Sequence, residues 1–489
     1  MLTPRALFGL LLLCLLPASS MAAQQAPTPT PEWLAATVDS VAERYQREGR
    51  VAGLSVAVLH DGRLLLARGY GVADLATGRP ATDSTLFAIG SVTKQFATVA
   101  ALLLEEEGKL SLDDKVAKWY PALTRANDIT VRDLVGHLSG YPDYYPLDFV
   151  DRRMAAATPT ETIIRRYAAG PLDFEPRTRW SYSNTGYLIL GRIVERVSGV
   201  PFGRFLERRI FHPLGMRHTR YEPDPTAPGI ARGYNTWALG PLQPATPEGG
   251  GWTGAAGGIY STAGDLARWD LALMTGKVVK PASWKFLTTS QRLASGKGAG
   301  YSGGLSIGQQ NGWLLLSHGG AVSGFIAGNT MVPGSRSAVI VLASAEDGGA
   351  SSGITRAAFR HFFERPAPAD LAVAPDSGAG DEELIPPTIS GPDAVTAAKT
   401  LFRALQAGTV DRSTLAAEYS HFLSAEKVAD AATRLGPLGE PAAVELRGQS
   451  ERGGMEVSLV LFRFEGLAVR ALMYRTPDGK IEEFLLGAQ

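Results

Sequence analysis

Apolar and polar residues alternate in short runs near both ends of a long first segment of the chain, a pattern typical of half-buried β-strands. Two pairs of these runs flank the dipeptides Asp61-Gly62 and Asn311-Gly312, which favour two-residue hairpin turns. Residues 338–343 add a uniformly apolar run, and the segment between the two ends has helical spacing. If the strands from both ends join one sheet, the central helices cover it, which predicts an α/β sandwich with a helical lobe. The paired runs are residues 54–59 with 63–67 and residues 304–309 with 313–317.

The pattern changes after the last apolar helix of this segment. A stretch rich in Pro, Ala, Gly, Ser, Asp and Glu has no periodicity, which is typical of a linker. Beyond it, residues 394–407 have the apolar spacing of a helix, and residues 443–486 contain three or four strand-like runs. We therefore expect a second domain that is separable from the first. The predicted boundaries are residues 33–365 for a large domain, 366–391 for the linker and 392–489 for a small α+β domain.

The first residues have the character of a secretory signal. Arg5 precedes an apolar run over residues 6–16, and small residues follow it up to Ala23. The run is far shorter than the roughly 20 apolar residues that span a bilayer. We therefore expect a signal peptide over residues 1–23, a mature chain without a membrane span, and a periplasmic or secreted location. Cys14, the single cysteine, lies inside this signal, so disulfides and thiolate catalysis are not expected in the mature chain.

Composition and charge narrow the class of protein further. The 48 basic side chains balance 48 acidic ones, and 45% of the residues are hydrophobic, as in an ordinary soluble globular protein. No basic patch indicates a nucleic-acid partner. The histidines are scattered without the spacing of metal ligands, and the glycine-rich residues 249–258 lack the strand-to-helix setting of a nucleotide site. We expect no metal, no cofactor and no nucleic acid, which leaves a small molecule or peptide as the partner.

The segment around Ser91 and Lys94 carries the first candidate chemistry. It opens a predicted helix that runs to about Glu107 and ends at Gly108. Residues three apart lie on one face of a helix, so Lys94 is expected beneath the Ser91 hydroxyl. The apolar body of the helix desolvates the lysine, which lowers its pKa and lets the neutral amine accept the serine proton. A surface Ser and Lys on a helix is the competing interpretation of this tetrapeptide on its own.

A second element stands just before an apolar helix over residues 188–197, where Tyr182 and Asn184 lie two apart. Both side chains can turn toward one cleft from such a position. As a phenolate, Tyr182 could shuttle the proton between nucleophile and leaving group. Asn184 could fix the lysine and donate to a substrate carbonyl. Packing and capping are the competing roles for a Tyr and an Asn before a helix.

A third element, from Ser317 to Ala321, follows a strand over residues 313–316. Its glycines would let a substrate approach the strand backbone, and the Ala321 amide could pair with the Ser91 amide as an oxyanion hole. A simple turn is the alternative for this segment alone. Taken together, the three elements predict the following site: Ser91, Lys94 and Tyr182 as catalytic residues, Asn184, His318 and Gly320 as substrate-orienting residues, and the Ser91 and Ala321 amides as oxyanion donors.

In these motifs, ordered Ser-x-x-Lys, Tyr-x-Asn and His-x-Gly, residues 33–365 resemble the serine hydrolases that share the fold of class C β-lactamases and low-molecular-weight penicillin-binding proteins. Residues 108–114, 129–140 and 256–261 look familial as well. The resemblance implies a β-lactamase/transpeptidase-like α/β fold and acyl transfer through a covalent Ser91 ester, followed by hydrolysis. Tyr182-Ser183-Asn184 replaces the Ser-Asp-Asn of class A enzymes, which indicates the class C arrangement. The C-terminal domain resembles the nuclear-transport-factor or SnoaL-like cone fold.

Several alternatives stay open at this point. Ser306 lies in a Gly-x-Ser-x-Gly match to the nucleophile elbow of α/β-hydrolases, but a hairpin turn follows it where the elbow needs a helix. A non-catalytic, penicillin-binding-like sensor is a second alternative. Family members that act on penicillins or D-alanyl peptides hold a substrate carboxylate with a hydroxyl-bearing strand, whereas Gly319 and Ala321 have no hydroxyl. We therefore expect a small neutral ester or amide as substrate, with a β-lactamase or D-alanyl carboxypeptidase as the alternative.

Overall fold

The computed structural model describes residues 30–145, 149–346, 348–372 and 387–488. The predicted signal peptide over residues 1–23 lies outside them, as does the greater part of the predicted linker. The start of that linker lies against the large domain, because the Ala367 amide donates to the Asn311 carbonyl at 2.8 Å. Within the described residues, no helix has both the length and the apolar character that a membrane span requires.

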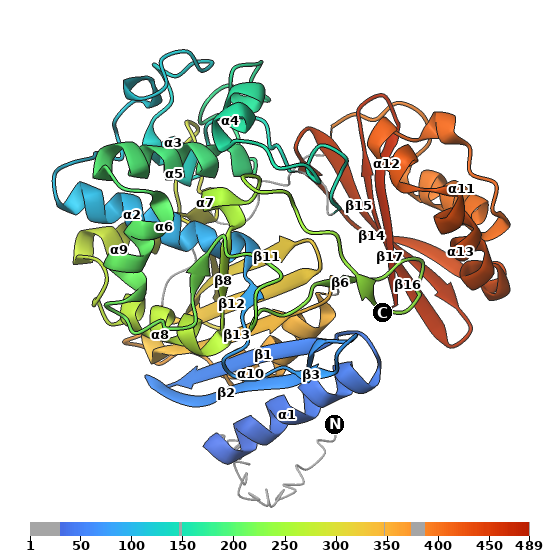
Figure 1. Cartoon of the computed structure of the whole chain (residues 1–489), viewed down its shortest axis with the longest axis horizontal. Coiled ribbons are helices and arrows are strands. Elements are labelled where there is room, and N and C mark those ends of the chain that lie inside the picture. The colour runs from blue at the N-terminus through green and yellow to red at the C-terminus, as the bar shows by residue number, and fades with distance from the viewer. Residues whose placement is uncertain (1–29, 146–148, 347, 373–386, 489) are drawn as a thin grey trace, which may run out of the picture.

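An eight-stranded antiparallel sheet forms the centre of the large domain (Figure 1). Its order is β3-β2-β1-β13-β12-β11-β10-β9, so strands from the two ends of the domain are neighbours, as the sequence predicts. Both predicted hairpin turns are present, because Asp61, Gly62, Asn311 and Gly312 all have the positive φ that such turns require. The strands are β1 (Gly53–His60), β2 (Arg63–Asp74), β3 (Arg79–Pro80), β9 (Tyr301–Ser302), β10 (Leu305–Gln310), β11 (Trp313–Val322), β12 (Phe325–Val332) and β13 (Ser337–Ala343).

The two faces of this sheet are buried against different helices. Val56 and Val58 of β1 join one core cluster with α1 and α10, whereas Ala57 and Leu59 join the main core with α2 and α8. Because successive side chains of a strand point to opposite faces, a strand buried on both sides must be apolar throughout. The covering helices are α1 (Pro31–Arg47), α2 (Thr93–Glu106), α8 (Ala263–Met274) and α10 (Gly349–Glu364).

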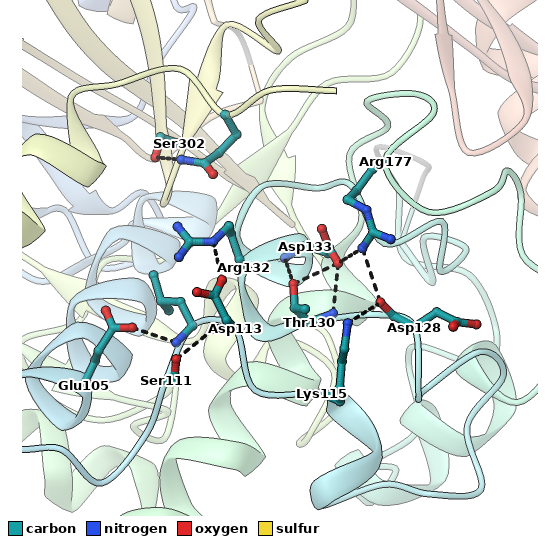
Figure 2. Close-up of polar contacts among 12 residues, drawn as sticks. Glu105, Ser111, Asp113, Lys115, Asp128, Thr130, Arg132, Asp133, Arg177 and Ser302 are labelled. Carbon is teal, nitrogen blue, oxygen red and sulfur yellow. Dashed lines mark hydrogen bonds and ion pairs between the residues drawn. The ribbon is translucent and has the colours of Figure 1, made fainter. Parts of the chain in front are cut away.

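The helical lobe lies beside the sheet and includes the short helix α3 (Val131–Val135) (Figure 1). Figure 2 shows that Thr130 and Asp133 form a capping box at the start of α3, and that Arg177 donates to the Asp133 carboxylate at 2.7 Å. This network fixes the turn that leads from α3 to His137. The other α-helices and short strands of the large domain are α4 (Thr160–Ala168), α5 (Asn184–Ser198), α6 (Phe202–Leu206), α7 (Gly254–Gly257), α9 (Pro281–Leu287), β4 (Phe87–Ala88), β5 (Arg220–Tyr221), β6 (Tyr234–Asn235), β7 (Gln243–Pro244) and β8 (Ile259–Ser261).

The C-terminal domain is a four-stranded antiparallel sheet in the order β14-β15-β16-β17, with three helices on one face. The first helix spans the predicted residues, and four strands follow it, so the predicted α+β class is confirmed. The finer resemblance to a nuclear-transport-factor-like cone stays a prediction. The elements are α11 (Ala394–Ala407), α12 (Ala417–Phe422), α13 (Ala425–Leu435), β14 (Ala443–Arg452), β15 (Met455–Phe464), β16 (Leu467–Arg475) and β17 (Ile481–Ala488).

Aromatic residues of the large domain anchor it to the C-terminal domain. Phe149 packs against Phe422, with ring centroids 4.8 Å apart, and the Trp237 indole donates to the Lys427 carbonyl at 2.8 Å. Phe149 and Trp237 both belong to the hydrophobic core of the C-terminal domain. The core of the C-terminal domain therefore includes side chains of the large domain, and the separability of the two domains stays a prediction.

Candidate active site

Ser91 lies where the sequence predicts, at the start of the long helix of the large domain. It occupies a short 3-10 turn, Gly90–Val92, directly before α2. The Lys94 amine lies 2.9 Å from Ser91 Oγ, so the predicted stacking of the two side chains is present. Ser91 is half-buried and opens onto a cavity, whereas Lys94 is completely buried.

The surroundings of Lys94 favour a neutral amine. Burial holds the pKa of Lys94 well below its usual range; the Asp143 carboxylate opposes this shift and the positive charge of Arg452 adds to it. Lys94 Nζ also contacts Asn184 Oδ1 at 2.7 Å and the Ala256 carbonyl at 2.8 Å. A neutral amine can donate its two hydrogens to these oxygens and keep its lone pair for the Ser91 proton. The geometry thus suits Lys94 as a proton acceptor.

Asn184 is held by contacts from both sides of its amide. It is the first residue of α5, and its Nδ2 donates to Asp143 Oδ1 at 2.9 Å while its Oδ1 accepts from Lys94. Its backbone amide also donates to Asp143 Oδ1, at 3.0 Å. Because both ends of the amide are engaged, its orientation relative to Lys94 is fixed. The capping role that competed for this position belongs to Ser183, whose hydroxyl accepts from the Gly186 amide.

Tyr182 lies over Lys94 in an aromatic pocket. The Lys94 amine is 4.8 Å from the centroid of the Tyr182 ring. The ring centroids of Tyr182 and His137 are 4.3 Å apart. Burial raises the pKa of Tyr182, and contact with Ser91 offsets this only in part. The resting residue is therefore a neutral phenol, which differs from the predicted phenolate because desolvation outweighs the charge of Arg452. His137 accepts a hydrogen bond from the Ser183 amide at 3.1 Å through Nδ1, which indicates a structural role.

The third predicted element lies inside a strand and not in a turn, because β11 continues to Val322. A Cβ at Gly320 would lie 2.0 Å from the Ile89 carbonyl, so only glycine allows β11 to approach the segment before Ser91 so closely. A Cβ at Gly90 would likewise lie 2.8 Å from the Ala321 amide nitrogen. The Ala321 amide thus lies beside the residue that precedes Ser91, as an oxyanion hole requires.

His318 is buried at the same place and contacts an aromatic hydroxyl. Its Nε2 lies 3.0 Å from Tyr301 Oη. Burial lowers the pKa of His318 to about 4. Near neutral pH this ring therefore carries no charge. Ser306, the alternative nucleophile of the Gly-x-Ser-x-Gly match, lies on β10 opposite Ser317. The hairpin turn that follows it rules out the strand-to-helix elbow.

Sequence motifs missed three residues that complete the site: Asp143, Tyr145 and Arg452. Arg452 lies on β14 of the C-terminal domain and donates to the Tyr145 carbonyl at 3.1 Å. The same carbonyl lies 3.4 Å from Asn184 Nδ2. A chain of contacts therefore runs from Lys94 through Asn184 to a cation of the second domain. No local pattern marks these residues, since a lone Asp or Arg in a loop or at a strand end has no diagnostic spacing.

The side chains that meet here can activate a serine without a metal. Among the described residues, no three His, Cys, Asp or Glu side chains gather as metal ligands. A serine against a buried neutral lysine, with a phenol above and a strand amide beside it, defines the class of serine hydrolases that act through an acyl-enzyme.

Residues 38–360 match the Beta-lactamase family, so the chain belongs to this family of serine hydrolases. It is 30% identical over 303 residues to Penicillin-binding protein 4* of Bacillus subtilis (strain 168), covering 59% of this chain and 66% of that protein. It is 31% identical over 280 residues to a D-aminopeptidase of Brucella anthropi, covering 56% of this chain and 52% of that protein. The chain thus spans about half to two thirds of these relatives. The structure of D-amino acid amidase from Ochrobactrum anthropi SV3 superposes with a TM-score of 0.58 at 26% identity, over 67% of this chain and 99% of that chain.

Proposed function

We propose that this protein is an exported serine hydrolase that cleaves small neutral esters or amides through an acyl-enzyme on Ser91. The observation that carries the proposal is the 2.9 Å contact between Ser91 Oγ and a fully buried Lys94. Export rests on the apolar leader over residues 6–16, which implies that the reaction takes place in the periplasm or outside the cell.

The reaction follows from the protonation states that burial imposes. Ser91 Oγ attacks the substrate carbonyl while its proton passes to the lone pair of Lys94 Nζ. The oxyanion forms beside the Ala321 and Ser91 amides, and its collapse expels the leaving group. As a neutral phenol, Tyr182 can give its proton to that group and regain one from Lys94. Water then attacks the Ser91 ester by the same steps in reverse, which releases the acid and restores the serine.

Preference for a neutral substrate follows from the chemistry of β11. Its residues at the cavity are the uncharged His318, which has its Nε2 against Tyr301, and Gly319, Gly320, Ala321 and Val322, none of which has a hydroxyl. A substrate carboxylate would find no charged or hydroxyl donor on this strand, and hydrogen bonds to charged groups are worth roughly 1.5–3 kcal/mol each. The relatives named as a D-aminopeptidase and a D-amino acid amidase are consistent with amide substrates.

Arg452 supports a second candidate function. It lines the cavity from the opposite side, where a guanidinium is the preferred partner of a carboxylate. A substrate carboxylate held there would favour a lactam or a D-alanyl peptide. Its hydrogen bonds to the Tyr145 carbonyl and to Tyr474 Oη engage it in the protein itself, which is why we rank this function second.

Comparing kcat/KM for p-nitrophenyl butyrate and nitrocefin tests the proposal. We expect the ester to be preferred by about tenfold or more, since each missing donor costs about one to two orders of magnitude in transition-state binding. Ser91→Ala provides the blank for both substrates. A clear preference for nitrocefin that disappears in Arg452→Gln would support the β-lactamase alternative. Stable acylation of Ser91 without turnover would indicate a sensor.

A further inference from the structure

The cavity above Ser91 has a second wall, which the C-terminal domain provides. The cavity has a volume of about 1070 Å³. Its floor contains Ser91, Tyr182 and Asn184, and side chains of β15, β16 and β17 line it from across the domain boundary. The family match ends at residue 360, so this wall lies outside the matched residues.

Strand register brings three leucines of this wall together, beside polar residues such as Arg452 and Arg470. Leu459, Leu472 and Leu485 lie opposite one another on three neighbouring strands and so form one row on one face of the sheet. All three line the cavity and are partly exposed. The alternating residues, such as Val460 and Met473, are fully buried in the core that the helices cover. Both faces of the sheet therefore carry apolar side chains at these positions, although α11, α12 and α13 cover only one face (Figure 1).

An antiparallel sheet with one solvated face normally alternates apolar and polar residues. A leucine row that stays partly exposed inside a cavity therefore indicates a ligand. The cavity reaches the upper end of the roughly 300–1,000 Å³ that is usual for ligand sites, so it has room beyond the acyl carbon on Ser91. Since the row and the nucleophile line one cavity, a single molecule can contact both.

We propose that Leu459, Leu472 and Leu485, the leucine row, bind an extended apolar group of the substrate whose carbonyl Ser91 attacks. This inference rests on the proposed hydrolase function and names its substrate class: esters or amides that carry an alkyl or aryl chain. Each methylene that the row buries should improve binding about threefold to fourfold.

Chain-length dependence tests this inference in the full protein. We would measure kcat/KM for p-nitrophenyl acetate and octanoate, which vary the acyl group, and for ethyl and octyl acetate, which vary the alcohol. The wild type should prefer the longer member of at least one pair by about tenfold or more. Leu472→Thr, which suits a strand but removes apolar surface, should lose most of that preference.

Leu446→Thr is the matched control. Leu446 lies on β14 of the same sheet, is 42% exposed and lies apart from the residues that line the cavity, so this variant should keep the wild-type preference. Leu485→Thr replaces Leu472→Thr if the latter has a lower melting temperature than the control. The inference is overturned if neither pair shows a preference in the wild type, or if the leucine-row variants keep the preference.

Calorimetric binding of acetamide and octanamide to Ser91→Ala separates this inference from the proposed function. If the wild type hydrolyses no ester but Ser91→Ala binds octanamide more tightly and loses this on adding Leu472→Thr, the hydrolase proposal is wrong and the leucine row stands. If esters are hydrolysed without any chain-length preference and the two amides bind equally, the leucine row is wrong and the hydrolase stands.

Discussion

Lys94 and Gln95 are neighbours on α2 and are both buried, yet their side chains enter two different polar clusters. Lys94 contacts Ser91 and Asn184, and both of these residues line the cavity. Lys94 itself is buried, but a substrate in the cavity can reach the serine that it contacts. The cluster ends at Arg452, in another domain.

Gln95 enters a closed cluster between α2, α8 and β12. It accepts from the Trp269 indole at 3.0 Å and donates to Asn329 Oδ1 at 3.2 Å. Asn329 in turn donates to Asp270 Oδ2 at 2.7 Å. All four side chains are buried, and none of them lines the cavity at Ser91.

The difference shows that burial alone does not make a catalytic group. Both clusters contain a titratable side chain whose pKa burial shifts strongly: the pKa of Lys94 is lowered well below its usual range, and the pKa of Asp270 is raised to about 8. Of these two clusters, only the Lys94 cluster includes residues that line the cavity, where a substrate can reach them. Changes in the Lys94 cluster should therefore alter activity, whereas changes in the Gln95 cluster should alter stability.

The largest effect is expected from removing the nucleophile or its proton acceptor. Ser91→Ala and Lys94→Met should each lower kcat/KM for an ester by about a thousandfold or more, because the two groups act in one proton transfer. Ser306→Ala, which removes the serine of the Gly-x-Ser-x-Gly match, is the control and should retain activity. Steady-state kinetics, with circular dichroism to confirm folding, checks this expectation. Full activity in Ser91→Ala would refute the assignment of the Lys94 cluster as the site.

Two variants that should shift the pKa of Lys94 in opposite directions test the electrostatics around this residue. The charge of Arg452 lowers the pKa of Lys94 and that of Asp143 raises it. The amine must be neutral to accept a proton, so the acid limb of kcat/KM reports its deprotonation. Arg452→Gln should move this limb to higher pH, with a loss on the order of three- to tenfold at its acid end, and Asp143→Asn should move it to lower pH.

Arg447→Gln is the control for this pair, because Arg447 is exposed on the same strand and pairs with Glu445. Its pH profile should match that of the wild type. Asp143→Asn also disturbs the contact with Asn184, which should lower its maximum rate. The readout is therefore the pH at the midpoint of the acid limb and not the maximum of kcat/KM. Shifts of Arg452→Gln and Asp143→Asn in the same direction would contradict the charge argument.

The smallest effect on activity, and the clearest on stability, is expected at Asp270. Its pKa is about 8 in the folded protein and near 4 in the unfolded chain, so both states are protonated at low pH. As pH rises from about 4 to 8, the unfolded state loses its proton first, and folding stability falls.

Asp270→Asn cannot titrate, so at neutral pH it should be more stable than the wild type, by on the order of 2 kcal/mol. Urea unfolding at pH 4 and pH 7.5 measures this, and the difference should disappear at the lower pH. Ester hydrolysis should stay unchanged. A variant that loses stability at neutral pH would show that the carboxyl acts as a charged partner of Asn329.

Local chemistry of the sequence determined a large part of this protein. The Asp-Gly and Asn-Gly turns, the helix over residues 394–407 and the position of Lys94 one turn after Ser91 follow from backbone preferences and from the period of the helix. The helix predicted over residues 188–197 is present as well, although it already begins at Asn184. Interactions between residues close in sequence act in the same way before and after folding, and this is why their patterns are legible.

The tertiary structure alone decided which groups surround these residues and in what protonation state. The Ala256 carbonyl contacts Lys94, and the charges of Asp143 and Arg452 act on it, all from distant parts of the chain. Desolvation by the assembled core makes Tyr182 a neutral phenol. The leucine row likewise depends on which face of the last sheet the helices cover. Burial and long-range electrostatics arise only when the chain is packed, because they depend on distances and dielectric that no sequence spacing specifies.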